Sequence, residues 1–254
     1  MLSVVVPTFN EEGCIDASLA RVSRHLGSQG LSWEIVVVDD GSTDATVSIV
    51  RRWAQADPRL RLVEEPHCGK GAAICRGMLA ARGQWRLMAD ADLSVSPEDW
   101  TVFLDAAREP GAAAVIVGSR EAAGACRIGE PLGRHAIGRV FNWMVRLLAV
   151  PGIKDTQCGF KLLGEDAARV LCPHLTVQGF AFDVELLFLA RRAGFRIQEV
   201  GVVWSSRPES RVRLQSGAAA FIDILRIRLR ELRGGYGGVA RRRPVAAEER
   251  RAES

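Results

Sequence analysis

The segment Asp90-Ala91-Asp92 carries two carboxylates separated by one residue, directly after an apolar run. Alternate residues of an extended segment point to the same side, so both side chains can converge on one cation. A hard divalent ion prefers oxygen ligands of this kind and could bridge the two carboxylates to a diphosphate. The spacing therefore predicts a metal site formed by Asp90 and Asp92.

A second pair of acids, Asp39 and Asp40, ends another apolar run and precedes Gly41 and Ser42. A turn into a helix explains the glycine and the serine. It does not explain two adjacent carboxylates at the end of a buried strand, where an unpaired charge is costly. Ribose hydroxyls or a base N–H would give these acceptors partners, so we expect the pair to bind a nucleoside.

The loop Gly69-Lys70-Gly71 could bring a cation and backbone N–H groups to a phosphate at a helix start. It is not a P-loop, because position 64 is Glu and a glycine follows the lysine. It is not a dinucleotide fingerprint either, because Ile74 occupies the third glycine position. The loop alone therefore does not define a phosphate site.

Short apolar runs alternate with helical patterns in the first half of the chain, and each of these segments follows such a run. The predicted buried strands are Leu2–Pro7, Ile35–Val38, Leu60–Val63, Trp85–Ala89 and Ala114–Val117. The predicted helices are Ile15–Leu26, Ala45–Ala56, Ala72–Ala81 and Glu98–Ala107. This alternation predicts an α/β fold, a mostly parallel sheet flanked by helices, with ligands at the carboxyl ends of the strands.

The second half of the chain is less regular. Its predicted elements are a helix over Gly133–Val150, a short strand after Cys158-Gly159-Phe160-Lys161, a helix over Asp183–Ala193, a strand over Arg196–Trp204 and an amphipathic helix over Gln215–Leu232. From Arg233 onward Gly, Arg, Ala and Glu dominate, which is typical of disorder. We expect a catalytic domain over residues 1–210, a C-terminal amphipathic helix over 211–233 and a disordered basic tail over 234–254.

Charge and cysteine usage exclude several classes of protein. The net charge of +4 in 254 residues is small, and its positive part is C-terminal, where residues 211–233 hold six Arg against two acids. That end could face phosphates or an anionic membrane surface, and we expect no nucleic-acid partner. The six cysteines show no regular spacing, which favours reduced thiols, and the four histidines give no zinc signature. The sequence shows no signal peptide and no membrane-spanning run. We therefore expect a cytoplasmic protein, which could bind peripherally at the inner face of the membrane.

Taken together, these motifs resemble the inverting glycosyltransferase family 2, which has the GT-A (Rossmann-like) fold. The donor-side resemblance lies in Val4–Glu12, Val38–Asp44, Gly69–Gly71 and Asp90–Asp92. Later segments look like those of the polyprenyl (dolichyl) phosphate glucosyl- and mannosyltransferases, namely Gly118–Arg120, Asp155–Lys161, Phe182–Leu187 and Ser210–Val212. The resemblance implies transfer of a hexose from UDP-glucose or GDP-mannose to a lipid phosphate, with Mg²⁺ or Mn²⁺.

The resemblance also assigns roles to individual positions. Nucleotide-sugar binding would fall to Pro7, Asn10, Glu12, Asp39, Asp40, Lys70 and Asp90. Asp90 and Asp92 would hold the metal, and Arg211 would close over the donor. Arg120 and Arg134 would bind the acceptor phosphate, for which a guanidinium is suited. Because that phosphate is already anionic, little base catalysis is needed, and metal stabilises the leaving diphosphate.

Two positions depart from the family pattern and leave the reaction open. Ser94 stands where some relatives carry Gln, and Gly138 stands where a Ser is common. Ser94 concerns the metal site, whereas Gly138 lies four residues after Arg134 and concerns the acceptor, so the acceptor could be a polyprenyl phosphate or a small soluble molecule. An isomerase or mutase that rearranges the bound nucleotide sugar without an external acceptor is the alternative. A protein that binds a nucleotide without chemistry is disfavoured by the paired acids.

Overall fold

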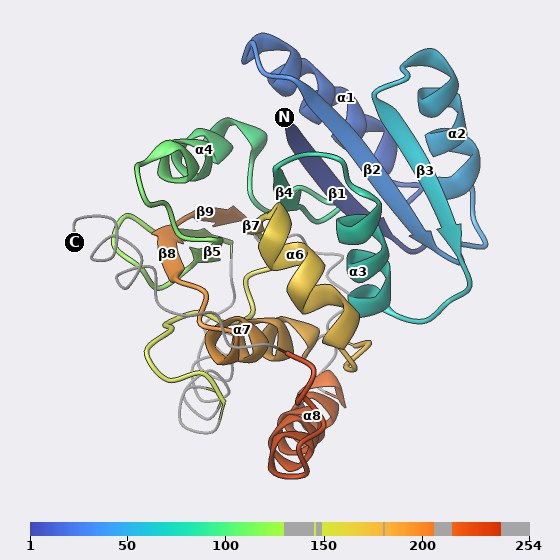
Figure 1. Cartoon of the computed structure of the whole chain (residues 1–254). Helices are drawn as coiled ribbons and strands as arrows, with labels where there is room; N and C mark the ends of the chain where they lie inside the picture. The colour runs from blue at the N-terminus through green and yellow to red at the C-terminus, as the bar shows by residue number, and fades with distance from the viewer. Residues whose placement is uncertain (130–144, 146–148, 180, 206–214, 240–254) are drawn as a thin grey trace.

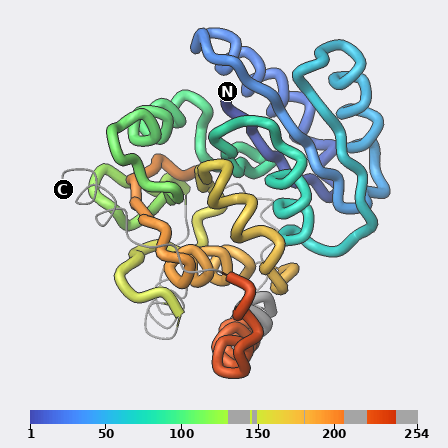
Figure 2. The backbone as a smooth tube through the Cα atoms, viewed as in Figure 1, coloured from blue at the N-terminus to red at the C-terminus, as the bar shows by residue number. Residues whose placement is uncertain are grey.

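The computed structural model describes residues 1–129, 145, 149–179, 181–205 and 215–239. Within these ranges the chain forms an α/β structure built on a central sheet, and Figure 1 shows helices packed along it. Figure 2 shows residues 1–80, drawn blue to cyan, lying beside residues 165–171, drawn yellow. The predicted fold class, a mostly parallel sheet flanked by helices, is confirmed.

The central sheet has the strand order β3-β2-β1-β4-β7-β5-β8. Its strands are β1 (Leu2–Thr8), β2 (Trp33–Asp40), β3 (Leu60–Glu65), β4 (Trp85–Met88), β5 (Val115–Ser119), β7 (Lys161–Gly164) and β8 (Ile197–Gly201). All pairs are parallel except those of β7, which runs antiparallel to both β4 and β5. A second, two-stranded sheet pairs β6 (Cys126–Ile128) with β9 (Val203–Ser205) in parallel.

Helices cover both faces of the sheet, as the fully buried strands β2 and β5 require. The helical elements are α1 (Ile15–Ser28), α2 (Thr46–Ala56), α3 (Lys70–Ala80), the 3₁₀ turn η1 (Pro97–Trp100), α4 (Thr101–Arg108), α6 (Glu165–Leu171), η2 (Cys172–His174), α7 (Phe182–Arg192) and α8 (Gln215–Leu232). On β2, Ile35 and Val37 pack into a core with α1, α2 and α4. The alternate residues Val36 and Val38 pack into a second core with α3, α6 and α7.

Several predicted elements are corrected by the structure. The strand expected over Arg196–Trp204 is interrupted at the buried Val202, so its two parts, β8 and β9, belong to different sheets. The helix expected from Ala72 begins two residues earlier at Lys70. The short elements β6 and α6 were not expected at all. Most of the helix expected over Gly133–Val150 lies outside the described residues.

The C-terminal helix α8 has the bounds predicted from its apolar spacing. Beyond it, the described residues 234–239 form turns in which Tyr236 and Val239 are buried. This start of the expected disordered tail is therefore ordered, because two apolar side chains in it reach the core. In the described part of the chain, every helix is too short or too polar to cross a bilayer.

Candidate active site

Several of the acidic and basic residues selected from the sequence, among those that the structure describes, lie at the carboxyl edge of the sheet. Asp39 and Asp40 end β2, the loop before α3 follows β3, and Asp90 lies two residues after β4. Arg120 directly follows β5. Because parallel strands present their carboxyl ends at one edge, residues far apart in the sequence share one site.

The centre of this site is an ion pair between Lys70 and Asp90. The Lys70 ammonium lies 2.6 Å from Asp90 Oδ1, and about a third of the Asp90 side chain is exposed. Burial works against ionisation, but Lys70, Lys161 and Arg120 together hold the pKa of Asp90 below its ordinary value. Burial likewise opposes the charge of Lys70, yet the carboxylates of Asp90, Asp183 and Asp92 raise its pKa. Lys70 and Asp90 are therefore both charged at neutral pH.

Asp90 and Asp92 lie in a tight turn rather than in the extended segment that the sequence suggested. The Leu93 amide donates to the Asp90 carbonyl at 3.0 Å, and Leu93 has a positive φ of 52°. Such a conformation is uncommon outside glycine, and here the Leu93 side chain is buried. Both carboxylates nevertheless act on the same ammonium, that of Lys70.

Ser94, which stands where some relatives carry Gln, donates two hydrogen bonds to Asp92. Its backbone amide and hydroxyl donate to Asp92 Oδ1 at 2.9 and 2.8 Å. This serine therefore orients a carboxylate. Among the described residues, nothing donates a hydrogen bond to Oδ2 of Asp92 or to Oδ2 of Asp90.

The carboxylates of Asp39 and Asp40 already have partners within the chain. Asp39 accepts from the amide of Ser42 at 2.8 Å, from its hydroxyl at 2.5 Å and from the Thr8 hydroxyl at 3.2 Å. Asp40 accepts from the amides of Cys68 at 2.7 Å and Gly69 at 2.9 Å. The premise that these acids lack partners without a nucleoside is therefore wrong. Their assignment to nucleoside binding stays a prediction.

The Gly69-Lys70-Gly71 loop uses its backbone N–H groups for packing. The Gly69 amide bonds Asp40, and the Gly71 amide donates to the Gln178 carbonyl at 2.8 Å. A Cβ at Gly71 would meet the Val177 carbonyl oxygen at 2.6 Å, so the glycine is needed for this close approach. The amides of Gly69 and Gly71 are therefore engaged within the chain. The Lys70 side chain, in contrast, points to Asp90.

The remaining predicted donor residues lie around the loop after β1. Pro7 pairs with Val38 across β1 and β2. Asn10, at a positive φ of 55°, accepts from the Thr43 amide at 2.7 Å. Glu12 accepts from the Ala45 amide at 2.9 Å. These contacts tie the loop to the turn after β2. Beside this turn, the rings of His67 and Phe9 stack with their centroids 4.2 Å apart. The Nδ1 atom of His67 lies 2.9 Å from Asp40 Oδ2.

Arg120 forms a two-pronged ion pair with Asp155. Its Nε and Nη2 lie 2.7 and 3.0 Å from the two carboxylate oxygens. Asp155 is buried, and although burial opposes ionisation, Arg120 and Lys161 hold its pKa below the ordinary value. The Arg120 guanidinium also lies 5.4 Å from the ring of Trp204. Two of its donors therefore have an internal partner, and its role toward an acceptor stays a prediction.

A buried pair beneath the site was not expected from the sequence. Lys161, at the start of β7, donates to Asp183 and to the Cys158 carbonyl at 2.5 Å each. Burial raises the pKa of Asp183, while Lys161 and Lys70 oppose the rise. Both residues lie in segments that resemble the family, Asp155–Lys161 and Phe182–Leu187. Their pairing was not predicted, because it depends on the antiparallel insertion of β7. Arg134 and Arg211, also predicted site residues, lie outside the described residues.

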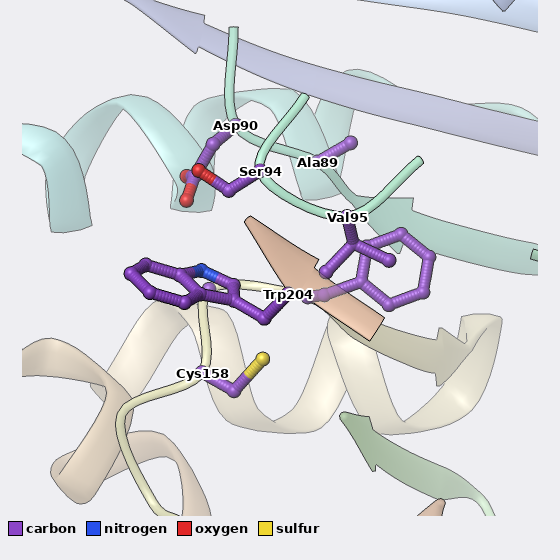
Figure 3. A pocket seen from close by; sticks show the side chains of 8 residues that line it. Ala89, Asp90, Ser94, Val95, Cys158 and Trp204 are labelled. Atoms are coloured by element: carbon purple, nitrogen blue, oxygen red, sulfur yellow. The ribbon is translucent and has the colours of Figure 1, made fainter. Parts of the chain in front are cut away.

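A small pocket opens beside Asp90. It is lined by Ala89, Asp90, Ser94, Val95, Cys158, Gly159, Phe160 and Trp204. Figure 3 shows the Trp204 ring facing Asp90 and Ser94, with Cys158 on the other side of the ring. A Cβ at Gly159 would lie 2.6 Å from Asp90 Oδ2, so only a glycine leaves the carboxylate room. The pocket therefore offers space, one carboxylate oxygen and an aromatic wall.

Asp90 and Asp92 fit a divalent cation by their donor chemistry. Each keeps one carboxylate oxygen to which no described residue donates. Among the described residues there is no cluster of three or more His, Cys, Asp or Glu that could hold a metal. Mg²⁺ commonly binds through one or two carboxylates plus substrate phosphates and water. The two acids therefore suit a cation whose other ligands come from a nucleotide diphosphate.

The chain is similar to known proteins over most of its length. The family model described as Glycosyl transferase family 2 matches residues 3–164. A dolichyl-phosphate beta-glucosyltransferase of Trichomonas vaginalis is 35% identical over 236 residues, covering 89% of this chain and 72% of that protein. The enzyme of the same name from Homo sapiens is 34% identical over 253 residues, covering 92% and 77%.

Solved structures show the same fold. A glucosyl-3-phosphoglycerate synthase from Mycobacterium tuberculosis, in complex with Mn²⁺, UDP and glucosyl-3-phosphoglycerate, superposes with a TM-score of 0.66. It shares 20% sequence identity, and the match covers 90% of this chain and 78% of that one. At this identity the likeness concerns the fold.

Proposed function

The chain belongs to glycosyl transferase family 2 and is a hexosyltransferase, and from this premise we propose that it transfers glucose from UDP-glucose to a polyprenyl phosphate. The observation that carries the proposal is the 35% identity to dolichyl-phosphate beta-glucosyltransferases across 89% of the chain. Of the two donors that the sequence motifs imply, UDP-glucose and GDP-mannose, the names of these relatives favour the glucose donor.

The proposed reaction forms one bond and breaks one. An oxygen of the acceptor phosphate attacks the anomeric carbon of the sugar. The bond from that carbon to the diphosphate oxygen breaks, and nucleoside diphosphate leaves with the electron pair. Because the attacking oxygen is already anionic, no strong general base is required. This suits a site in which Asp90 is ion-paired to Lys70 and is held in its charged form.

Charge compensation is then the main task of the site. We propose that Asp90 and Asp92 hold Mg²⁺ or Mn²⁺, which when bound would supply electrophilic stabilisation of the leaving diphosphate. Lys70 lies against Asp90 and can offer its ammonium to the same diphosphate oxygens. Ser94 fixes the orientation of Asp92 through two hydrogen bonds.

Nucleoside binding is proposed for the turn after β2 and the loop after β1. Pro7, Asn10 and Glu12 stay in this proposal, together with Asp39 and Asp40. The internal hydrogen bonds of the two acids are compatible with it, since a carboxylate has about four acceptor sites. Arg120 and Arg134 are proposed to bind the acceptor phosphate, and Arg211 is proposed to close over the donor. Arg134 and Arg211 lie outside the described residues.

The decisive experiment incubates the protein with radiolabelled UDP-glucose and GDP-mannose, each with Mn²⁺, with and without polyprenyl phosphate. Label entering the lipid phase from UDP-glucose, with equimolar UDP released, is the expected result. Transfer from GDP-mannose instead would change the donor assignment. Conversion of the intact nucleotide sugar without acceptor and without release of nucleoside diphosphate would establish the mutase alternative. No contact among the described residues favours that alternative.

A further inference from the structure

The helix α8 carries two apolar rows, and only one of them packs on the protein. Ile224 and Ile227 are fully buried against the core that contains α7. A second row is exposed, comprising Phe221 (37% exposed), Ile222 (48%), Leu225 (47%), Leu229 (46%) and Leu232 (79%). At about 100° per residue these five positions share one sector of the helix about 100° wide. Figure 1 shows α8 at the margin of the molecule, beyond α7.

The helix is fixed to the domain without the exposed row. Arg192 on α7 pairs with Glu231 on α8 and donates to the Tyr236 carbonyl at 3.2 Å. The Tyr236 hydroxyl bonds the buried Glu185, which also accepts from the amides of Thr176 and Val177. The exposed leucines are therefore not needed to hold α8 in place, and their exposure needs another explanation.

Arginines border the exposed apolar row on both sides. By helical position, Arg228 lies at one edge, and Arg226 and Arg233 lie at the other. All three side chains are exposed. The acids of this segment, Asp223 and Glu231, fall outside the apolar sector. An apolar stripe between cationic borders matches the acyl and headgroup layers of an anionic bilayer.

We propose that α8 docks the enzyme onto the surface of an anionic lipid bilayer, with Phe221, Ile222, Leu225, Leu229 and Leu232 entering the acyl boundary. The helix lies on the membrane rather than across it, because its 18 residues include five charged ones. A second copy of the chain is a poorer occupant. One helix row is smaller than a standard interface of about 20 to 30 residues a side, and the cationic borders would meet each other. The docking surface itself is argued from α8. Its role, which is to bring the site to a lipid acceptor, rests on the proposed function.

The test compares two double variants in the full chain. Leu225→Glu with Leu229→Glu places two charges in the exposed row. Leu79→Glu with Val102→Glu places the same charges at single exposed apolar positions on α3 and α4, 44% and 54% exposed. Flotation uses vesicles of phosphatidylcholine alone and of phosphatidylcholine with phosphatidylglycerol. Thermal unfolding and transfer to a short, water-soluble prenyl phosphate are measured on the same preparations.

We expect wild type and the Leu79/Val102 variant to float with the anionic vesicles and to dissociate as salt rises. The Leu225/Leu229 variant should bind at least tenfold more weakly while keeping its unfolding temperature and its activity on the soluble acceptor. Replacing Arg226 or Arg233 with Gln should weaken anionic binding about fivefold each. If all proteins lack transferase activity but flotation behaves as stated, the proposed function fails and the docking surface stands.

Three results would overturn the docking surface. The first is a wild type that stays unbound with anionic vesicles at low salt, and the second is a Leu225/Leu229 variant that floats like wild type. The third is a wild type that sediments as a dimer and does not bind vesicles while the Leu225/Leu229 variant sediments as a monomer. That outcome would assign the exposed row to a second copy of the chain.

Discussion

Lys70 and Asp90 form an ion pair of 2.6 Å between the start of α3 and the turn after β4. The lysine thus occupies one oxygen of a carboxylate that we propose as a metal ligand. The charge of Asp92 acts on the same ammonium. The free enzyme therefore contains an internal cation where a divalent ion would bind, and the two must share the carboxylates.

Replacing Lys70 with Met should separate metal binding from turnover. Loss of the internal cation should raise the affinity of the free enzyme for Mn²⁺ several-fold, because Asp90 is no longer neutralised. The transfer rate should fall about ten- to a hundredfold, since the diphosphate loses a charge-assisted contact of about 1.5–3 kcal/mol. Mn²⁺ titration by electron paramagnetic resonance and initial rates measure the two effects. Lys154→Met, at an exposed position, is the control. An unchanged rate would remove Lys70 from the donor site.

Asp92→Asn should abolish metal-dependent nucleotide binding and lower activity at least a hundredfold while the fold is kept. The reason is that one of two carboxylates loses its charge, and the described residues offer no third acidic, histidine or cysteine ligand nearby. Calorimetry of UDP binding with Mn²⁺ and with a chelator tests this. Asp105→Asn, which alters an exposed acid on α4, should leave both readouts unchanged. Full activity of Asp92→Asn, or of wild type in chelator, would refute the metal assignment.

Mn²⁺ and nucleotide should bind in a mutually dependent way. Two carboxylates alone hold a cation weakly, and the nucleotide diphosphate would complete its ligands. We expect the Kd for Mn²⁺ to fall at least tenfold when UDP is present, and the Kd for UDP to fall by the same factor when Mn²⁺ is present. Calorimetric titrations in both orders measure the coupling. Tight Mn²⁺ binding without nucleotide would point to ligands outside Asp90 and Asp92.

The sheet edge that gathers these residues could be read from the sequence, because strand–helix alternation fixes which ends of the strands meet. The conformation of the segment Asp90 to Asp92 could not. It depends on Leu93 at a positive φ, which the apolar pattern does not show. The partners of Asp40 were equally hidden, since the amides of Cys68 and Gly69 reach it only after β3 pairs with β2.

The buried pair of Lys161 and Asp183 shows a second limit. Strand–helix alternation predicts parallel neighbours, whereas β7 enters antiparallel between β4 and β5. Only that insertion carries Lys161 toward Asp183. In contrast, the bounds of α8 followed from its apolar spacing. What the spacing did not show was that one apolar row packs on the domain and the other stays exposed.

Gly159→Ala should weaken metal and nucleotide binding with little effect on folding. The added Cβ would lie 2.6 Å from Asp90 Oδ2, so the carboxylate must move away from its present position. We expect a ten- to hundredfold loss of Mn²⁺-dependent UDP binding, from the loss of about one charged contact. Gly27→Ala, on α1 with nothing within 4 Å of the added Cβ, is the matched control. Equal UDP binding by both variants would show that Asp90 needs no space beside Gly159.

The pair of Arg120 and Asp155 should contribute stability that depends on pH. Burial opposes ionisation of Asp155, but Arg120 outweighs it and lowers the pKa below the ordinary value. A lowered pKa in the folded state means that the stabilisation is present above about pH 4, the unfolded value. It is lost as the pH falls through the folded pKa. Wild type should therefore lose this part of its stability only in acid.

Arg120→Ala should be destabilised by about 3 kcal/mol at pH 7, since the buried Asp155 carboxylate loses its guanidinium partner and keeps the amides of residue 120 and Gln157 as donors. The deficit should shrink below pH 4, where protonated Asp155 no longer needs a cation. Asp155→Asn removes the acid but keeps the guanidinium. If Arg120 also binds the acceptor phosphate, Arg120→Ala should lose about ten- to a hundredfold in kcat/KM for the acceptor, and Asp155→Asn should lose far less. Thermal unfolding from pH 3 to 8 and acceptor kinetics at pH 7 measure both roles. Equal kinetic losses in the two variants would confine Arg120 to a structural role.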